Sequence, residues 1–215
     1  MESIFKILLV IHIIAGSIGL FTGTINIIRE KGNEPHKKVG TFFLYGMLVN
    51  GFAGLAMSLL HTNYFLLIIA VFSIYLVGTG QRSLSLKQLT KGQKPNKIDW
   101  ILSISMLVFA IGFIGFGGYL IFNQNNFGIV LIVFGMISIL MVLKDLKNYK
   151  GNSKYKNYWL LTHVQRMIGG YIAATTAFLV VNNTILPGVV TWLLPTVILT
   201  PVIFYWSRKY AVIKK

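Results

Sequence analysis

The chain alternates between long apolar runs and short polar connections. A helix that crosses a bilayer core needs about 20 mostly apolar residues, and seven runs approach or exceed that length. They cover about residues 4–28, 39–60, 64–84, 98–122, 127–143, 158–181 and 189–206. No stretch between them is long enough to fold alone. The pattern therefore predicts an all-α fold, an integral membrane bundle of seven transmembrane helices that forms a single domain over residues 1–215.

The polar connections differ in charge, and this difference predicts an orientation. The connections around His61, Asn125 and Asn182 contain no Lys or Arg. The other connections and the tail are basic, with Arg29, Lys31, Lys37, Lys38, Arg82, Lys87, Lys91, Lys94, Lys97, Lys144, Lys147, Lys150, Lys154, Lys156, Arg208, Lys209, Lys214 and Lys215. Because Lys and Arg are enriched in cytoplasmic loops, we expect the N-terminus outside and the C-terminus in the cytoplasm, in a multi-pass protein of the bacterial inner membrane.

Composition agrees with a membrane protein and narrows its partners. Of 215 residues, 55% are hydrophobic and 12% are charged, and the formal net charge is +15, whereas soluble domains carry about 25% charged residues. Such a basic total would suggest nucleic acid in a soluble protein. Here the excess lies in the predicted cytoplasmic segments, so we expect the bilayer and anionic lipid headgroups as partners, and no nucleic acid. Zero cysteines exclude disulfides, iron–sulfur clusters and thiolate zinc sites, and we predict no metal site.

Small residues recur at helical spacing in three of the runs. Small residues on one helical face let membrane helices pack closely, so these stripes predict helix–helix contacts. The stripes are His12, Gly16, Gly19, Gly23 and Asn26 in the first run; Gly46, Asn50 and Gly54 in the second; and Gly112, Gly115 and Gly118 in the fourth.

Polar and ionisable side chains inside the runs are the candidate ligand-binding residues. An ionisable residue at membrane depth is by default a candidate functional residue. The candidates are His12, Asn50, His163, Arg166 and Asp145. Asp145 falls at the C-terminal end of the fifth run, where the helix dipole disfavours a negative charge, so we expect a cationic partner, with Arg166 as one candidate.

Four histidines in a cysteine-free bundle raise the possibility of b-type haem, because imidazole is a common axial ligand. The predicted topology places His12 and His61 in the outer half and His36 and His163 in the inner half. Their depths are unequal, since His36 and His61 would lie about 37 Å apart on one continuous helix. A haem b electron carrier or oxidoreductase with these ligands therefore stays open as an alternative, and whether the chain is an enzyme is left undecided.

Short motifs in the first three runs resemble a known family. His12-x3-Gly16, the entry Pro35-His36-Lys37-Lys38-Val39-Gly40 and the segment from Tyr75 to Arg82 are similar to bacterial polytopic membrane proteins of the domain of unknown function 2306 family. The resemblance covers about the first 90 residues. It implies an integral membrane protein with histidines at these positions, and it assigns no activity.

Three functions remain compatible with the sequence. The first is binding of a small ligand, lipid or quinone within the helical bundle. The second is electron transfer through histidine-ligated haem. The third is transport of a small molecule, with His12, Asn50, His163 and Arg166 lining a cavity; an odd number of spans and the lack of a visible internal repeat weaken it.

Overall fold

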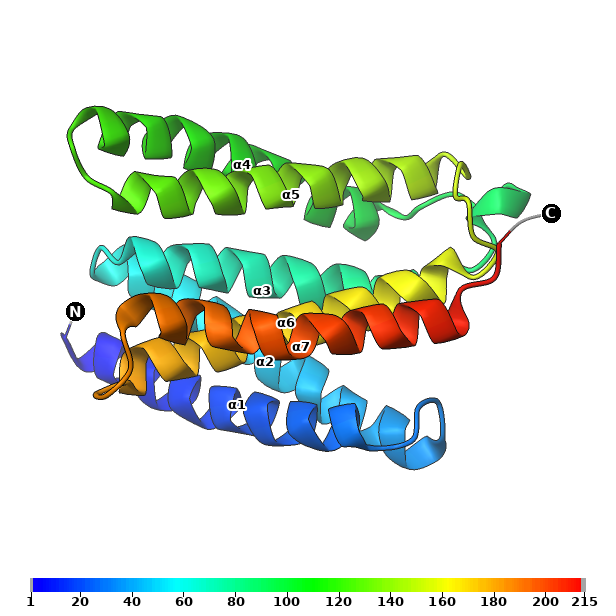
Figure 1. Cartoon of the computed structure of the whole chain (residues 1–215), viewed down its shortest axis with the longest axis horizontal. Coiled ribbons are helices and arrows are strands. Elements are labelled where there is room, and N and C mark those ends of the chain that lie inside the picture. Colours follow the sequence, from blue (N-terminus) through cyan, green and yellow to red (C-terminus); the bar gives the residue numbers. More distant parts are fainter. Residues whose placement is uncertain (1, 214–215) are drawn as a thin grey trace. The chain divides into compact units, whose positions relative to one another are not determined.

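The computed structural model describes residues 2–213, apart from the side chains of residues 188 and 189, and the described chain is helical (Figure 1). Among the described residues, seven helices are long and apolar enough to cross a membrane, which confirms the predicted number. They are α1 (Glu2–Ile28), α2 (Glu34–Leu60), α3 (Tyr64–Ser83), α4 (Lys97–Phe122), α5 (Phe127–Tyr149), α6 (Tyr158–Asn182) and α7 (Gly188–Tyr210), with a short 3-10 helix η1 (Leu89–Lys91) before α4. The only extended pairing in the described residues is an isolated bridge between Tyr155 and Ile213.

Local sequence signals explain where two of the helices begin. α2 starts at Glu34 rather than at Val39, because the side chain of Asn33 caps the helix and accepts a hydrogen bond from the backbone N–H of His36 at 2.9 Å. At the start of α4 the carboxylate of Asp99 accepts a hydrogen bond from the backbone N–H of Asn96 at 2.7 Å, as in a capping box. Polar residues at these ends therefore belong to the helices, which extend beyond the apolar runs.

The chain divides into two compact units. Unit 1 consists of Met1–Ser83 with Leu160–Ala211, and unit 2 of Leu84–Trp159 with Val212–Lys215. Unit 1 thus contains α1, α2, α3, nearly all of α6, and α7, whereas unit 2 contains η1, α4 and α5. Unit 2 interrupts unit 1 in the sequence.

Close backbone packing joins the helices of unit 1, as the glycine stripes of the first two runs predict. A Cβ atom added to Gly46 would lie 3.0 Å from the carbonyl oxygen of Ala15 and 3.1 Å from the backbone nitrogen of Gly19. Around this contact, Phe43, Met47 and Val77 form a buried cluster against which Met167 and Tyr171 of α6 pack. α1, α2, α3 and α6 are therefore held together by small residues and a shared apolar core.

Unit 2 is built on an α4–α5 hairpin, visible in green in Figure 1. The two backbones meet at Gly117 and Gly128, where a Cβ on Gly117 would lie 2.7 Å from the carbonyl oxygen of Gly128. The sequence predicts that α4 packs through Gly112, Gly115 and Gly118. This prediction is wrong, because a Cβ at any of these three glycines would meet nothing within 4 Å in the described structure. Spacing alone identified three glycines on one face, but the face that packs in the hairpin is the one that contains Gly117.

Candidate functional site

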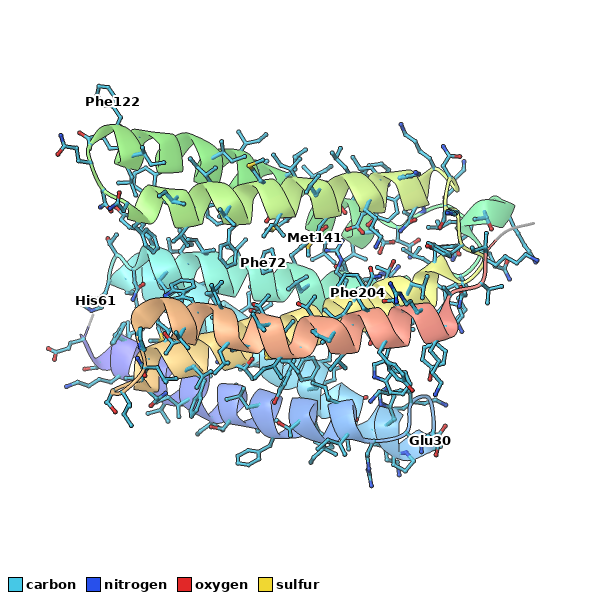
Figure 2. All side chains as sticks on the ribbon, in the orientation of Figure 1. Glu30, His61, Phe72, Phe122, Met141 and Phe204 are labelled. Atoms are coloured by element: carbon cyan, nitrogen blue, oxygen red, sulfur yellow. The ribbon has the colours of Figure 1, made fainter. Side chains whose placement is uncertain are left out.

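Unit 1 carries polar side chains at several levels between its two ends, which His61 and Glu30 mark in Figure 2. Two places bring histidines into polar contacts. One lies between α1 and α2 around His12, and the other lies near the α1–α2 connection and the first turns of α6, around His36 and His163. The second place contains the larger group of polar side chains.

His12 and Asn50 form a pair that links α1 to α2. The Nδ1 atom of His12 lies 3.0 Å from the carbonyl oxygen of Asn50, and the side-chain amide of Asn50 donates a hydrogen bond to the carbonyl oxygen of His12 at 2.8 Å. Nδ2 of Asn50 also lies 3.2 Å from Nδ1 of His12. In the tautomer with a proton on Nδ1, the ring donates to the carbonyl and Nε2 is its acceptor atom. Asn50 also lies against α1 at Gly16, where a Cβ would be 2.7 Å from its amide nitrogen.

His36 and Asn26 each bury a polar atom that has no hydrogen-bond partner among the described residues, Nδ1 of His36 and Oδ1 of Asn26. Asn26 lies near the end of α1, and His36 lies near the start of α2. Asn26 is 3.2 Å from the position of a Cβ on Gly40, which follows His36 by one turn on the same face of α2. A buried polar atom without a partner costs about 1–3 kcal/mol, so a ligand or water that bonds these atoms would recover that cost.

Lys31 closes the end of α1 beside this group. Its ammonium donates hydrogen bonds to the carbonyl oxygens of Asn26, Ile27 and Arg29, at 2.7 Å for Ile27 and 2.9 Å for Arg29. It also lies 5.0 Å above the ring of Trp206 on α7. All three ammonium protons are therefore used by the protein, and partial burial lowers the pKa of Lys31. Lys31 contributes positive charge to the site without a free donor.

His163 on α6 and Lys31 both lie close to His36. The Nδ1 atom of His163 lies 3.0 Å from the carbonyl oxygen of Gly80 on α3, so Nδ1 carries the proton and Nε2 is an acceptor. Arg166, one turn further along α6, is 4% exposed, and its guanidinium lies 4.6 Å from the centre of the Tyr75 ring on α3. His163 and Arg166 together fix α6 against α3.

The remaining predicted residues lie elsewhere. His61 is exposed at the end of α2, and its ring packs edge to face against Phe5 at 4.6 Å, whereas His12 contacts Asn50. Asp145 is 3% exposed and belongs to unit 2, while Arg166 belongs to unit 1, and their pairing stays a prediction. Among the described residues, no group of three or more His, Asp or Glu side chains could hold a metal ion.

We name the group formed by Asn26, Lys31, His36 and His163 the inner polar cluster. Sequence reasoning identified its two histidines, and it placed Asn26 in the small-residue stripe of α1. It gave Lys31 no role, because a lysine in a basic connection looks like every other lysine there. The Tyr75 contact with Arg166 was also missed, although Tyr75 begins the motif at the end of the third run.

The inner polar cluster combines two imidazole rings and an amide with one fixed positive charge. The nearby carboxylate of Glu34 forms an ion pair with Lys37 at 2.6 Å, and both side chains are exposed. The imidazole and amide groups of the cluster can donate hydrogen bonds to the carbonyl groups of a ligand and accept hydrogen bonds from its hydroxyl groups. Comparison with family models, with curated proteins and with solved structures found no match for this chain.

Proposed function

We propose that this chain is a multi-pass protein of the bacterial cell membrane that binds a small lipophilic ligand of the quinone class at the inner polar cluster. The observation that carries the proposal is the pair of buried atoms without partners, His36 Nδ1 and Asn26 Oδ1, in the group that contains His163. Seven apolar helices support the membrane location, and the basic connections support an N-terminus outside and a cytoplasmic C-terminus. The motif resemblance supports membership of the domain of unknown function 2306 family.

The chemistry of a quinol suits the atoms that this cluster offers. A quinol hydroxyl can donate to Nε2 of His163, whose other ring nitrogen donates to Gly80. A second hydroxyl can donate to Oδ1 of Asn26, and a quinone carbonyl can accept from a protonated Nδ1 of His36. The neighbouring core of unit 1 is apolar, with Phe43 and Tyr171 among its side chains, which favours a lipophilic molecule over a fully hydrated one.

The test is a titration of the detergent-purified chain with ubiquinone-1, followed by the quenching of tryptophan fluorescence. Trp206 contacts Lys31 of the cluster, and we expect a saturable signal. Loss of one buried hydrogen bond, worth about 1.4 kcal/mol, corresponds to a tenfold weaker affinity. We therefore expect His36→Phe to raise Kd about tenfold. The matched variant His61→Phe, which changes an exposed histidine at the other end of α2, should leave Kd unchanged; equal effects of both variants would contradict the proposal.

A b-type haem is the second candidate, and one specific observation favours it. His12 and His163 each direct Nδ1 at a backbone carbonyl, which is how metal-ligating histidines are usually oriented. The purified chain should then show a Soret band whose reduced form appears on addition of dithionite. His163→Ala should remove that band. A colourless, folded preparation that still binds ubiquinone-1 would exclude haem as a resident cofactor and leave the quinone proposal standing.

A further inference from the structure

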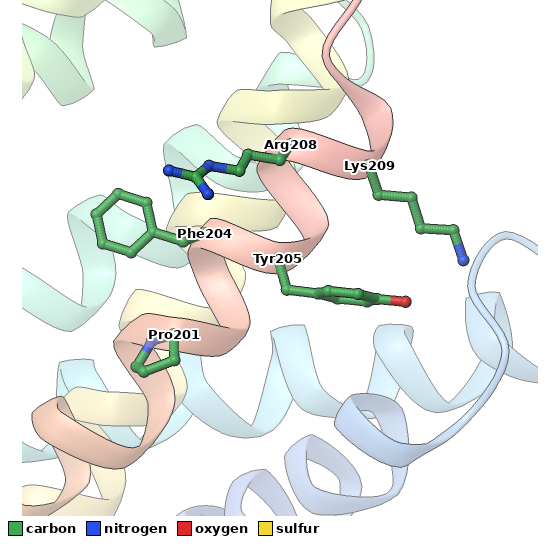
Figure 3. Close-up of a pocket in the computed structure, with 5 residues that line it drawn as sticks. All are labelled: Pro201, Phe204, Tyr205, Arg208 and Lys209. Carbon is green, nitrogen blue, oxygen red and sulfur yellow. The ribbon is translucent and has the colours of Figure 1, made fainter.

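The cytoplasmic third of α7 carries a hollow of about 740 Å³ on its surface. Its lining consists of Pro201, Phe204, Tyr205, Arg208 and Lys209, all of which lie in unit 1. In Figure 3 the side chains of Phe204 and Arg208 extend to one side of the helix, and those of Tyr205 and Lys209 to another. The compact ring of Pro201 lies one turn before the two aromatic residues. The hollow therefore has an aromatic part and a cationic part, ordered along the helix.

An exposed apolar lane leads into this hollow from the preceding turns of α7. Leu193 and Val197 precede Pro201 at intervals of four residues, and they are 54% and 66% exposed. From Leu193 to Arg208 the helix rises about 22 Å, whereas half of a bilayer core is about 15 Å thick. The lane is thus long enough for one acyl chain of a single leaflet, with the cations at the level of the headgroup.

The charge at the end of the lane selects the headgroup. Arg208 and Lys209 occupy the last turn of α7, and the chain contains no Asp or Glu after Asp145. The ammonium of Lys209 lies 4.9 Å above the ring of Trp206, and its side chain extends to another side of the helix than that of Arg208. The guanidinium of Arg208 presents a planar fork that matches two phosphate oxygens. Arg208 extends to the same side of the helix as Phe204, so its guanidinium can hold the phosphate, while Lys209 on another side adds positive charge to the same turn.

We propose that this hollow is a binding site for one anionic glycerophospholipid, with its phosphate at Arg208, Lys209 as an additional positive charge in the same turn, and one acyl chain along Leu193, Val197, Pro201 and Phe204. The proposal differs from a general attraction of the basic segments to anionic lipid, because it assigns one lipid to one place. It is independent of the inner polar cluster, so either proposal can fail alone.

The experiment is native mass spectrometry of the full chain from mixed micelles that contain equal amounts of phosphatidylglycerol and phosphatidylcholine. The wild type should retain one phosphatidylglycerol in preference to phosphatidylcholine. Removing two interfacial cations should weaken retention about 30-fold. The test variant is Arg208→Gln/Lys209→Gln. The matched control is Lys91→Gln/Lys94→Gln, which removes the same charge from exposed positions of another basic connection.

The comparison of the two double variants decides between a site and a diffuse attraction. Selective loss of phosphatidylglycerol from the α7 variant, with retention by the control, supports the site. Equal loss from both variants, or equal retention of phosphatidylcholine and phosphatidylglycerol by the wild type, would overturn it. Phe204→Ala, which keeps both cations, provides a second arm. It should reduce retention by shortening the apolar wall, and unchanged retention would contradict the assigned position of the acyl chain.

Discussion

The contact between Gly117 and Gly128 makes a sharp prediction about the stability of the α4–α5 hairpin. In Gly117→Ala, the new methyl group would lie 2.7 Å from the carbonyl oxygen of Gly128 and 2.9 Å from Cγ1 of Ile132. Since the nearest atom belongs to the backbone, it cannot move away by a side-chain rotation. The two helices must separate, or the hairpin must shift.

The magnitude follows from two opposing terms. Overpacking a close contact costs about 1–3 kcal/mol, whereas replacing Gly by Ala in a helix interior gains up to about 1 kcal/mol. The matched control is Gly115→Ala, at an exposed position of the same helix where a Cβ meets nothing within 4 Å of the described atoms. Both variants gain the same helical term, so the difference between them measures the contact alone, about 1–3 kcal/mol.

Equilibrium unfolding in mixed detergent and dodecyl sulfate micelles, followed by circular dichroism, measures this difference. We expect Gly117→Ala to unfold at a lower fraction of dodecyl sulfate than wild type, and Gly115→Ala to unfold at an equal or higher fraction. If both variants match the wild type, α4 and α5 do not approach at Gly117, and the reasoning from backbone contact is refuted.

Three further predictions concern other parts of the chain. Tyr149→Phe removes a hydroxyl that lies 3.0 Å from Oγ of Ser103 and 3.2 Å from the carbonyl oxygen of Asp99, so the free energy of unfolding should fall by about 0.5–1.5 kcal/mol in the same assay; an unchanged value would show that these bonds do not stabilise unit 2. Burial lowers the folded-state pKa of Lys31, so between that pKa and the ordinary value of about 10.4 the unfolded chain binds more protons than the folded chain. The free energy of unfolding should therefore rise with pH in that window. Lys31→Met should flatten the rise, and an equal slope in the variant would exclude Lys31 as its source. Green fluorescent protein fused to the C-terminus should fluoresce in cells while an alkaline phosphatase fusion at the same place stays inactive, and the reverse result would refute the proposed orientation.

The seven helices could be predicted because apolar length and charged boundaries are local properties of the sequence. Their ends could not be predicted as well, since a polar residue can belong to a helix when a cap satisfies its backbone. Glu34 and Pro35 are helical because Asn33 caps the first turn of α2. The packing of glycines also needed the structure, because a Cβ at Gly112, Gly115 or Gly118 would meet no described atom within 4 Å.

The candidate site was predictable in part, because the charges of the connections are also a local property of the sequence. Positive-inside reasoning assigned His36 and His163 to the same end, and the structure places them near enough for electrostatic interaction. It could not indicate that Lys31 folds back onto the carbonyl groups of α1, or that Oδ1 of Asn26 is buried without a partner. Both facts depend on the path of the connection between α1 and α2. The residues of that connection are of types that are also typical of a solvated loop, so the sequence does not indicate this path.

The interruption of unit 1 by unit 2 has a consequence for synthesis at the ribosome. The Gly80–His163 hydrogen bond and the contact of Gly170 with Val77 join α3 to a helix that follows the whole of α4 and α5. At 5–20 residues per second, the segment between Ser83 and Leu160 takes roughly 4–15 s to translate. During that interval α3 is present without α6, and its small-residue surface around Gly80 is uncovered. In a nascent chain that stalls in the α4–α5 segment, this face of α3 therefore stays uncovered and accessible to insertion factors and proteases.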